Sequence, residues 1–299
     1  MKPNLILANP TAGQGRGARI LSETLAFLDS QRLRYTVIAT SSLDSAVDEL
    51  LRKNHDDFER LLVIGGDGMM HHAVNAIYGE NREESRAYLP IGLIPAGTGN
   101  DFARALNLNL KNPVSNIDRY ITAAQQKVDL GFVNGRFFGA ICSTGFDSLV
   151  NERANRMSWP KGKRKYDIAM VQELPRFKAR PYEIEIDGKR MEVRAMLIAV
   201  ANGPSYGGGM KVCPAANLHD GLLDVMILHP VPKGEFLRIF PKVYSGSHVS
   251  HPQVEIMRGK NVRIIGDAVT YADGERIAPT PVQISVKESL LQTWSAHDS

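Results

Sequence analysis

The chain has 299 residues, 43% of them hydrophobic, which predicts two globular domains with buried cores. Charged residues of both signs are frequent, which argues against intrinsic disorder. The net charge of +4 is too small to indicate nucleic acid as a partner. No apolar run approaches the roughly 20 residues of a membrane-spanning helix, and Asn9-Pro10 interrupts the apolar start, so we expect neither a transmembrane helix nor a signal peptide.

The two cysteines, Cys142 and Cys213, lie far apart among apolar or small residues. A disulfide framework needs more cysteines at closer spacing, so we expect two buried thiols and a reducing, cytoplasmic environment.

The first 128 residues alternate between strand and helix patterns. Strands are predicted over Asn4–Ala8, Arg34–Ala39, Leu61–Ile64 and Leu89–Ile94. A helix is predicted after each strand. The first covers Gly17–Leu28, and the second begins after a cap at Ser42 or Asp44. The third contains Ala73, Val74 and Ile77, and the fourth begins near Phe102. The alternation predicts an α/β domain over residues 1–128, with an open, mostly parallel sheet and helices on both faces.

Beyond Val128 short strands dominate. Alternating segments such as Tyr182–Ile186, Val262–Ile264 and Val282–Val286 are separated by turn pairs such as Asn134-Gly135, Asp187-Gly188 and Asp273-Gly274. We therefore expect an antiparallel β-sandwich domain over residues 129–286, with a helical insertion near 148–177. The C-terminal tail, residues 287–299, could pack back on the first domain.

Three glycine-rich turns follow strands in the first domain. They cover Asn9–Gly15, Gly65–Gly68 and Gly97–Asn100. Open α/β sheets bind ligands at the carboxyl ends of their strands, and glycines let main-chain N–H groups approach phosphates there. One such turn has a purely structural explanation, but three in one sheet favour phosphate binding. Neither a P-loop motif nor a dinucleotide-binding glycine motif occurs.

These motifs resemble the diacylglycerol kinase catalytic-domain family, which includes bacterial lipid kinases and the sphingosine and ceramide kinases. The resemblance is strongest in Gly65–Gly68 and Pro95–Arg104. It continues in Asn9-Pro10 with Gly13 and Gly15, Asn202-Gly203 with Gly207–Gly209, Cys213–Ala215, Asp220–Asp224 and Asp273–Glu275. The resemblance implies a first domain like those of NAD kinase and phosphofructokinase, a C-terminal β-sandwich, and a nucleotide cleft between the two.

The resemblance also assigns roles to single residues. It implies that ATP contacts Asn9, Thr40, Gly65, Gly66, Asp67, Gly68, Met69, Met70, His71, Gly97, Thr98 and Asn100. Asp67 and Asp101 would organise Mg²⁺ and water near the phosphates, although each could instead cap a helix. Glu275 would be the general base, because a lipid hydroxyl is a poor nucleophile until its proton is accepted. Without the resemblance, Asp273–Glu275 would be only a hairpin turn.

A second Mg²⁺ site is implied at Asn217, Asp220 and Leu222, through one carboxylate and main-chain carbonyls. Oxygen ligands suit this cation, but Asp220-Gly221 could equally be an ordinary turn. Asp129 resembles a further carboxylate of the magnesium network, with a hydrogen-bond acceptor on a hinge strand as the alternative.

The chain departs from the family pattern just after Gly68. The family has Thr and then an Asn- or His-Glu pair, whereas this chain has Met69, His71 and His72. Met69 cannot donate a hydroxyl hydrogen bond, and adjacent histidines point in different directions on a helix, which makes them a poor metal pair. These changes keep open a degenerate nucleotide-binding module without turnover.

The predicted function is ATP-dependent phosphorylation of a lipid hydroxyl, with diacylglycerol as the acceptor and phosphatidate as the product. NAD kinase is the second enzyme alternative, although the stretch Asn100–Arg104 weighs against it. The basic and aromatic residues Arg153, Arg156, Trp159, Lys161, Lys163, Arg164 and Lys165 form either a solvated surface or a contact with anionic lipids at the inner membrane. Related bacterial kinases suggest a homodimer.

Overall fold

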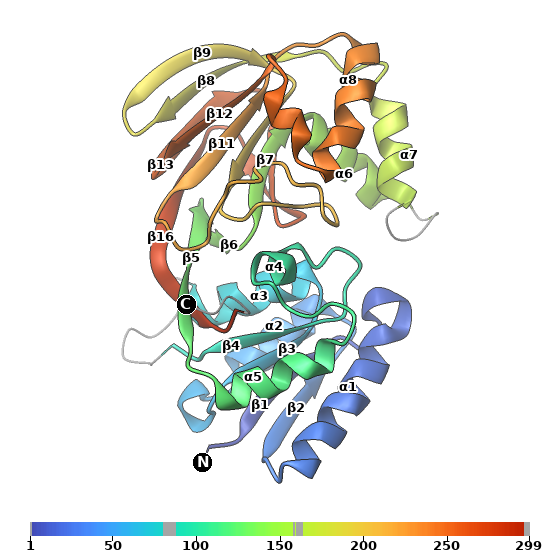
Figure 1. Cartoon of the computed structure of the whole chain (residues 1–299), viewed down its shortest axis with the longest axis vertical. Helices are drawn as coiled ribbons and strands as arrows, with labels where there is room; N and C mark the ends of the chain where they lie inside the picture. Colours follow the sequence, from blue (N-terminus) through green and yellow to red (C-terminus); the bar gives the residue numbers. More distant parts are fainter. Residues whose placement is uncertain (1, 80–87, 158, 160–163, 296–299) are drawn as a thin grey trace. The chain divides into compact units, whose positions relative to one another are not determined.

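The computed structural model describes residues 2–79, 88–157, 159 and 164–295. The chain forms two compact units (Figure 1). Unit 1 comprises Met1–Val128 and Ser289–Ser299, and unit 2 comprises Asp129–Glu288. In the described ranges, no helix combines the length and apolar character needed to cross a bilayer.

The centre of unit 1 is a four-stranded sheet in the order β2-β1-β3-β4, and all of its pairs are parallel. The strands are β1 (Asn4–Ala8), β2 (Tyr35–Ala39), β3 (Leu61–Gly65) and β4 (Ile91–Pro95). Every residue of β1, β3 and β4 is buried, because helices cover both faces of the sheet. The predicted parallel α/β domain is confirmed.

The helices of unit 1 are α1 (Ala12–Ser30), α2 (Leu43–Leu51), α3 (Asp67–Tyr78), α4 (Asp101–Ala105) and α5 (Asn116–Thr122), with short 3₁₀ turns η1 (His55–Asp57) and η2 (Pro113–Ser115). Right-handed crossovers place α1 and α5 on one face of the sheet and α2 and α3 on the other (Figure 1). Ser42, not Asp44, caps α2, because its Oγ accepts the N–H of Ser45 at 3.3 Å.

The C-terminal segment of the chain belongs to unit 1. Thr293 donates its hydroxyl to the Ile91 carbonyl at 2.7 Å, and Trp294 donates its indole N–H to the Ala123 carbonyl at 3.1 Å. The Trp294 ring is buried 5.3 Å from that of Tyr120. The last described residues thus complete the core beside β4.

Unit 2 is built on two six-stranded sheets with the orders β12-β11-β10-β7-β14-β15 and β6-β5-β16-β13-β8-β9. Their strands are β5 (Gln126–Val133), β6 (Arg136–Phe138), β7 (Ile141–Gly145), β8 (Arg180–Ile186), β9 (Lys189–Ala195), β10 (Leu197–Ala201), β11 (Leu223–Leu228), β12 (Val254–Gly259), β13 (Asn261–Gly266), β14 (Val269–Ala272), β15 (Glu275–Pro279) and β16 (Val282–Thr293). The sandwich predicted for this half is confirmed.

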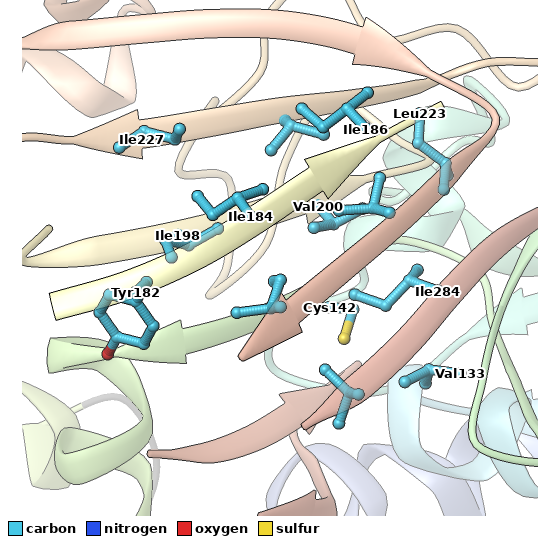
Figure 2. Packing of buried hydrophobic residues seen from close by; sticks show 14 of the residues in the cluster. Val133, Cys142, Tyr182, Ile184, Ile186, Ile198, Val200, Leu223, Ile227 and Ile284 are labelled. Atoms are coloured by element: carbon cyan, nitrogen blue, oxygen red, sulfur yellow. The ribbon is translucent and has the colours of Figure 1, made fainter. Parts of the chain in front are cut away.

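The main core of unit 2 lies between the two sheets (Figure 2). Ile198 and Val200 of β10 point toward Ile184 and Ile186 of β8, which lies in the opposite sheet. Alternate residues of β10, such as Ala199, point the other way into a second apolar cluster. Because both faces of β10 and β11 are buried, these strands are almost entirely apolar.

Helices cover the outer face of the β10-containing sheet. They are α6 (Phe146–Arg156), α7 (Arg164–Glu173), α8 (Lys233–Ile239) and the 3₁₀ turns η3 (Phe240–Tyr244) and η4 (Ser247–Ser250). The ring of Phe146 lies 5.1 Å from the rings of both Phe177 and Phe236, which joins these segments into one layer.

Candidate functional site

The three glycine-rich turns of unit 1 meet at the carboxyl ends of β1, β3 and β4. A Cβ atom added at Gly97 would lie 2.4 Å from the Cα of Gly66, so the second and third turns touch main chain to main chain. A Cβ atom added at Gly13 would lie 2.1 Å from the Ala96 carbonyl oxygen, so the first turn touches the third. Any side chain larger than that of glycine would therefore collide where the turns touch.

The first turn precedes the regular part of α1. Gly13, Gln14 and Gly15 have φ values of 57°, 63° and 94°, so regular helical geometry begins only after them, close to the predicted start at Gly17. Asn9 braces this turn, because its Oδ1 accepts the N–H and the hydroxyl of Thr11 at 2.9 and 2.8 Å.

Two arginines contact the turns: Arg16 joins the first turn to the third, and Arg104 stays within the third turn and the start of α4. Arg16 donates to the Gly13 carbonyl at 3.3 Å and to the Gly97 carbonyl at 2.5 Å. Arg104 donates to the Gly99 carbonyl and pairs with Asp101 at 3.2 Å. Sequence reasoning gave neither arginine a role, although cations beside glycine turns are what a phosphate site requires.

Asp67 and Asp101 both lie at these turns, but neither is the N-cap of its own helix. Gly66 and Asn100 hold those positions. Asp67 instead accepts the N–H of Phe102 at 3.0 Å, so it caps α4 from the neighbouring helix. Asp101 is 4% exposed and faces Arg104.

Asn100 supplies an unused oxygen at this site. Its backbone is left-handed, with φ of 57°, and its Nδ2 donates to the Gly97 carbonyl at 2.8 Å. Its Oδ1 is buried and has no hydrogen-bond partner among the described residues, which is costly unless a ligand satisfies it. A cation or a ligand donor would fit that oxygen.

The remaining predicted nucleotide contacts differ in accessibility. Thr98 is exposed. Thr40 follows β2, and its hydroxyl accepts the N–H of Ser42 at 3.1 Å. The side chains of Met69, Met70 and His71 are only 2–3% exposed, which favours main-chain contacts from this stretch.

Glu275 lies in unit 2 as the first residue of β15, where it is partly buried. Asp273 and Gly274, with φ values of 51° and 87°, form the tight turn from β14. The Asp273 carboxylate accepts the N–H groups of Gly139 and Ala140 at 2.8 and 2.9 Å, which ties the hairpin to the start of β7. Burial, together with the charge of Glu275, raises the pKa of the α7 residue Tyr166.

A carboxylate that sequence reasoning did not select lies at the start of α6. Asp147 accepts the N–H of Ser148 at 2.8 Å and the hydroxyl of Tyr206 at 3.4 Å. Burial raises the pKa of Asp147 to about 6. The available signal was its place two residues after Gly145, which ends β7 and has a φ of 109°.

The predicted second magnesium residues lie together in unit 2. Asn217 Oδ1 accepts the N–H of His219 at 3.1 Å, and Asp220 Oδ1 accepts that of Leu222 at 3.1 Å. Asp129 is 2% exposed, and its Oδ2 accepts the N–H of Gly221 at 2.8 Å. Asp129 therefore braces the loop as a hydrogen-bond acceptor.

The two carboxylates beside this loop share one arginine partner. Arg258 pairs with Asp220 and, at 3.2 Å, with Asp224. Within the described part of the chain, Asp224 Oδ2 is buried without a hydrogen-bond partner, and burial raises the pKa of Asp224. No group of three His, Cys, Asp or Glu side chains suited to a metal occurs among the described residues, so a cation here would depend on amide and main-chain oxygens as well.

The predicted basic patch is only partly described. Lys161 and Lys163 lie outside the described residues, as does the side chain of Arg164. Arg153 is paired with Glu173 of α7, so its charge is partly neutralised. Trp159 is 79% exposed, and Lys165 lies 5.1 Å from the ring centre of Tyr166.

Comparison with known proteins matches both halves of the chain. The diacylglycerol kinase catalytic domain matches residues 3–133, and the YegS C-terminal NAD kinase beta sandwich-like domain matches residues 140–294. A diacylglycerol kinase of Mycobacterium tuberculosis is 36% identical over 96% of this chain and 93% of its own. The diacylglycerol kinase of Bacillus subtilis is 28% identical over 88% of this chain and 86% of its own.

The fold has a counterpart among solved structures. A putative diacylglycerol kinase from Bacillus anthracis matches with a TM-score of 0.78 and 22% identity, over 98% of this chain and 95% of that one. The match establishes the shared fold, and the sequence relatives establish kinship. The chain belongs to the diacylglycerol kinase catalytic-domain family, whose named members are lipid kinases.

Proposed function

We propose that the protein transfers the γ-phosphate of ATP to a lipid hydroxyl, with diacylglycerol as the acceptor and phosphatidate as the product. The observation that carries this proposal is the convergence of three glycine turns with Arg16 and Arg104 in unit 1. Family membership supports it, because the relatives are named diacylglycerol kinase.

In this proposal the glycine turns bind the polyphosphate. Their N–H groups and the N-termini of α3 and α4 supply partial positive charge, and the two arginines supply full charges. Asp67, Asp101 and Asn100 would hold Mg²⁺, which neutralises phosphate charge when bound. Phosphoryl transfer depends mostly on such positioning and charge stabilisation.

Glu275 is the proposed general base. Its carboxylate would accept the proton of the lipid hydroxyl as the new bond to phosphorus forms. Asp273 would act indirectly, because its hydrogen bonds to Gly139 and Ala140 fix the hairpin that presents Glu275. Asn217, Asp220 and Leu222 would hold a second, structural Mg²⁺.

Transfer of ³²P from [γ-³²P]ATP to lipids in mixed micelles tests this proposal. Diacylglycerol, ceramide, phosphatidylglycerol and polyprenol are compared as acceptors, with NAD as the soluble alternative. We expect label in phosphatidate and a loss of at least 100-fold in Glu275→Gln. Glu192→Gln, an exposed change on edge strand β9, is the matched control and should retain activity. Label in NADP, or equal transfer by Glu275→Gln, contradicts the proposal.

A nucleotide-binding module without turnover is the second candidate, supported by the buried Met69 where the family has Thr. Calorimetry would then show ATP binding with no transfer to any lipid, and Met69→Thr would restore turnover. Transfer by the wild-type chain excludes this candidate.

A further inference from the structure

The helical segment from α8 to η4 presents apolar side chains to solvent. Leu237 is 52% exposed, Tyr244 38% and Val249 39%. Together with Arg238, Pro241 and Lys242, which are also exposed, these residues are termed the α8 surface. Single exposed apolar residues are normal, but a group of them on one segment indicates an interaction.

The α8 surface is not needed to pack the helix onto its sheet. The inward residues Phe236 and Ile239 are each 5% exposed and already anchor α8 in the outer core. Leu237, Pro241 and Tyr244 follow at intervals of four and three residues, so they form a separate stripe along α8 and η3. The segment is therefore apolar on a second, solvent-facing side.

The charge around this stripe is positive. No Asp or Glu occurs from Phe236 to Val254, and the Glu235 carboxylate lies 3.0 Å from His251. Among the described residues Arg238 and Lys242 make no ion pair. The exposed Lys211 adjoins them, because its N–H donates to the Val243 carbonyl at 2.9 Å.

We propose that the α8 surface docks on bilayers that contain anionic lipids. Exposed apolar and aromatic side chains beside unpaired cations are what an interfacial segment needs, since the apolar groups enter the headgroup region while the cations meet lipid phosphates. The α8 surface does not include Trp159 or the basic residues around it. This proposal rests on the proposed function in one respect: the bilayer would carry the lipid substrate.

Docking at this surface would act on encounter with the membrane and not on chemistry. The α8 surface contains none of the residues proposed to bind nucleotide or accept the proton. Its loss should therefore raise the apparent KM for diacylglycerol in anionic vesicles, while turnover of a short-chain diacylglycerol dispersed in detergent stays unchanged.

Vesicle flotation with the full chain tests the proposal. Wild type is compared with Leu237→Ala/Tyr244→Ala and with Arg238→Gln/Lys242→Gln, on phosphatidylcholine vesicles with and without 30% phosphatidylglycerol. Leu51→Ala/Arg52→Gln is the matched control, because Leu51 of α2 is 50% exposed and Arg52 is also exposed, but both lie in unit 1. Thermal melts verify that all variants are folded.

We expect about fivefold weaker binding to anionic vesicles for each cation removed, at least fivefold for the apolar pair, and no change in the control. Wild-type binding by both α8 variants, or equal wild-type binding to neutral and anionic vesicles, overturns the proposal. So does a dimer in sedimentation equilibrium that the α8 variants dissociate, since the surface would then contact a second copy. If lipid transfer fails but the α8 variants still lose vesicle binding, the proposed function falls and the docking surface stands.

Discussion

Gly97 shows how tightly single residues are constrained where the glycine turns meet. Because a Cβ at Gly97 would lie 2.4 Å from the Gly66 Cα, Gly97→Ala must push two main-chain segments apart. We expect a loss of about 1–3 kcal/mol in the free energy of unfolding and weaker ATP binding, measured by urea denaturation and calorimetry. Gly234→Ala in α8 is the control, since no atom of the described residues lies within 4 Å of its added Cβ. Equal stability of the two variants contradicts the packing argument.

Asp147 predicts a pH dependence of stability. Its pKa is about 6 in the folded chain against an ordinary value of 3.8, so the folded state binds the proton more tightly. The carboxyl therefore destabilises the fold above pH 6, and this cost disappears as pH falls toward 4. We expect Asp147→Asn to stabilise the chain by about 1–3 kcal/mol at pH 7.5 and to change little at pH 4.

Urea denaturation at the two pH values measures this difference. Asp48→Asn, on the exposed side of α2, is the matched control for the exchange of a carboxylate for an amide. A destabilised Asp147→Asn at pH 7.5 would show that the hydrogen bonds from Ser148 and Tyr206 need a charged acceptor.

At the scale of elements, the Asn217–Leu222 loop makes a prediction about metal. If Asp220 and its neighbours hold Mg²⁺, a concentration tenfold above the Kd stabilises unit 2 by about 1.4 kcal/mol. Asp220→Asn should abolish that gain, as should a chelator, in a thermal shift assay. Asp267→Asn on an exposed loop should keep it. Loss of the gain in both variants, or in neither, would contradict a site at Asp220.

At the scale of the whole molecule, the end of the sequence stabilises its beginning. Trp294 is buried in unit 1 against Tyr120, and Arg60 lies 5.6 Å from its ring centre. We expect Trp294→Ala to cost about 3–5 kcal/mol and to raise hydrogen exchange in β3 and β4, but not in β10 or β11 of unit 2. Gln292→Ala, a partly exposed change nearby, should have little effect. An equal rise in hydrogen exchange in the strands of both units would contradict the placement of Trp294 in the core of unit 1.

Much of the architecture follows from local patterns. Apolar runs and turn pairs predicted the parallel sheet and the sandwich, because strand burial and turn geometry impose residue types over a few positions. The segment Gly65–Gly68 was identified in the same way. The helical spacing of Ile20, Leu25 and Leu28 predicted a start of α1 at Gly17, and the structure places regular helical geometry just after the left-handed Gly13–Gly15.

The contacts that join distant residues were decided only by the tertiary structure. Arg16 reaches Gly97, Asp67 caps a helix 35 residues later, and the surroundings of Asp147 raise the pKa of its carboxyl. The burial of Trp294 and the exposure of Leu237 are equally invisible in the sequence, where both read as apolar. Periodicity encodes which side chains an element turns to one face, but the neighbour that meets that face depends on how the elements pack.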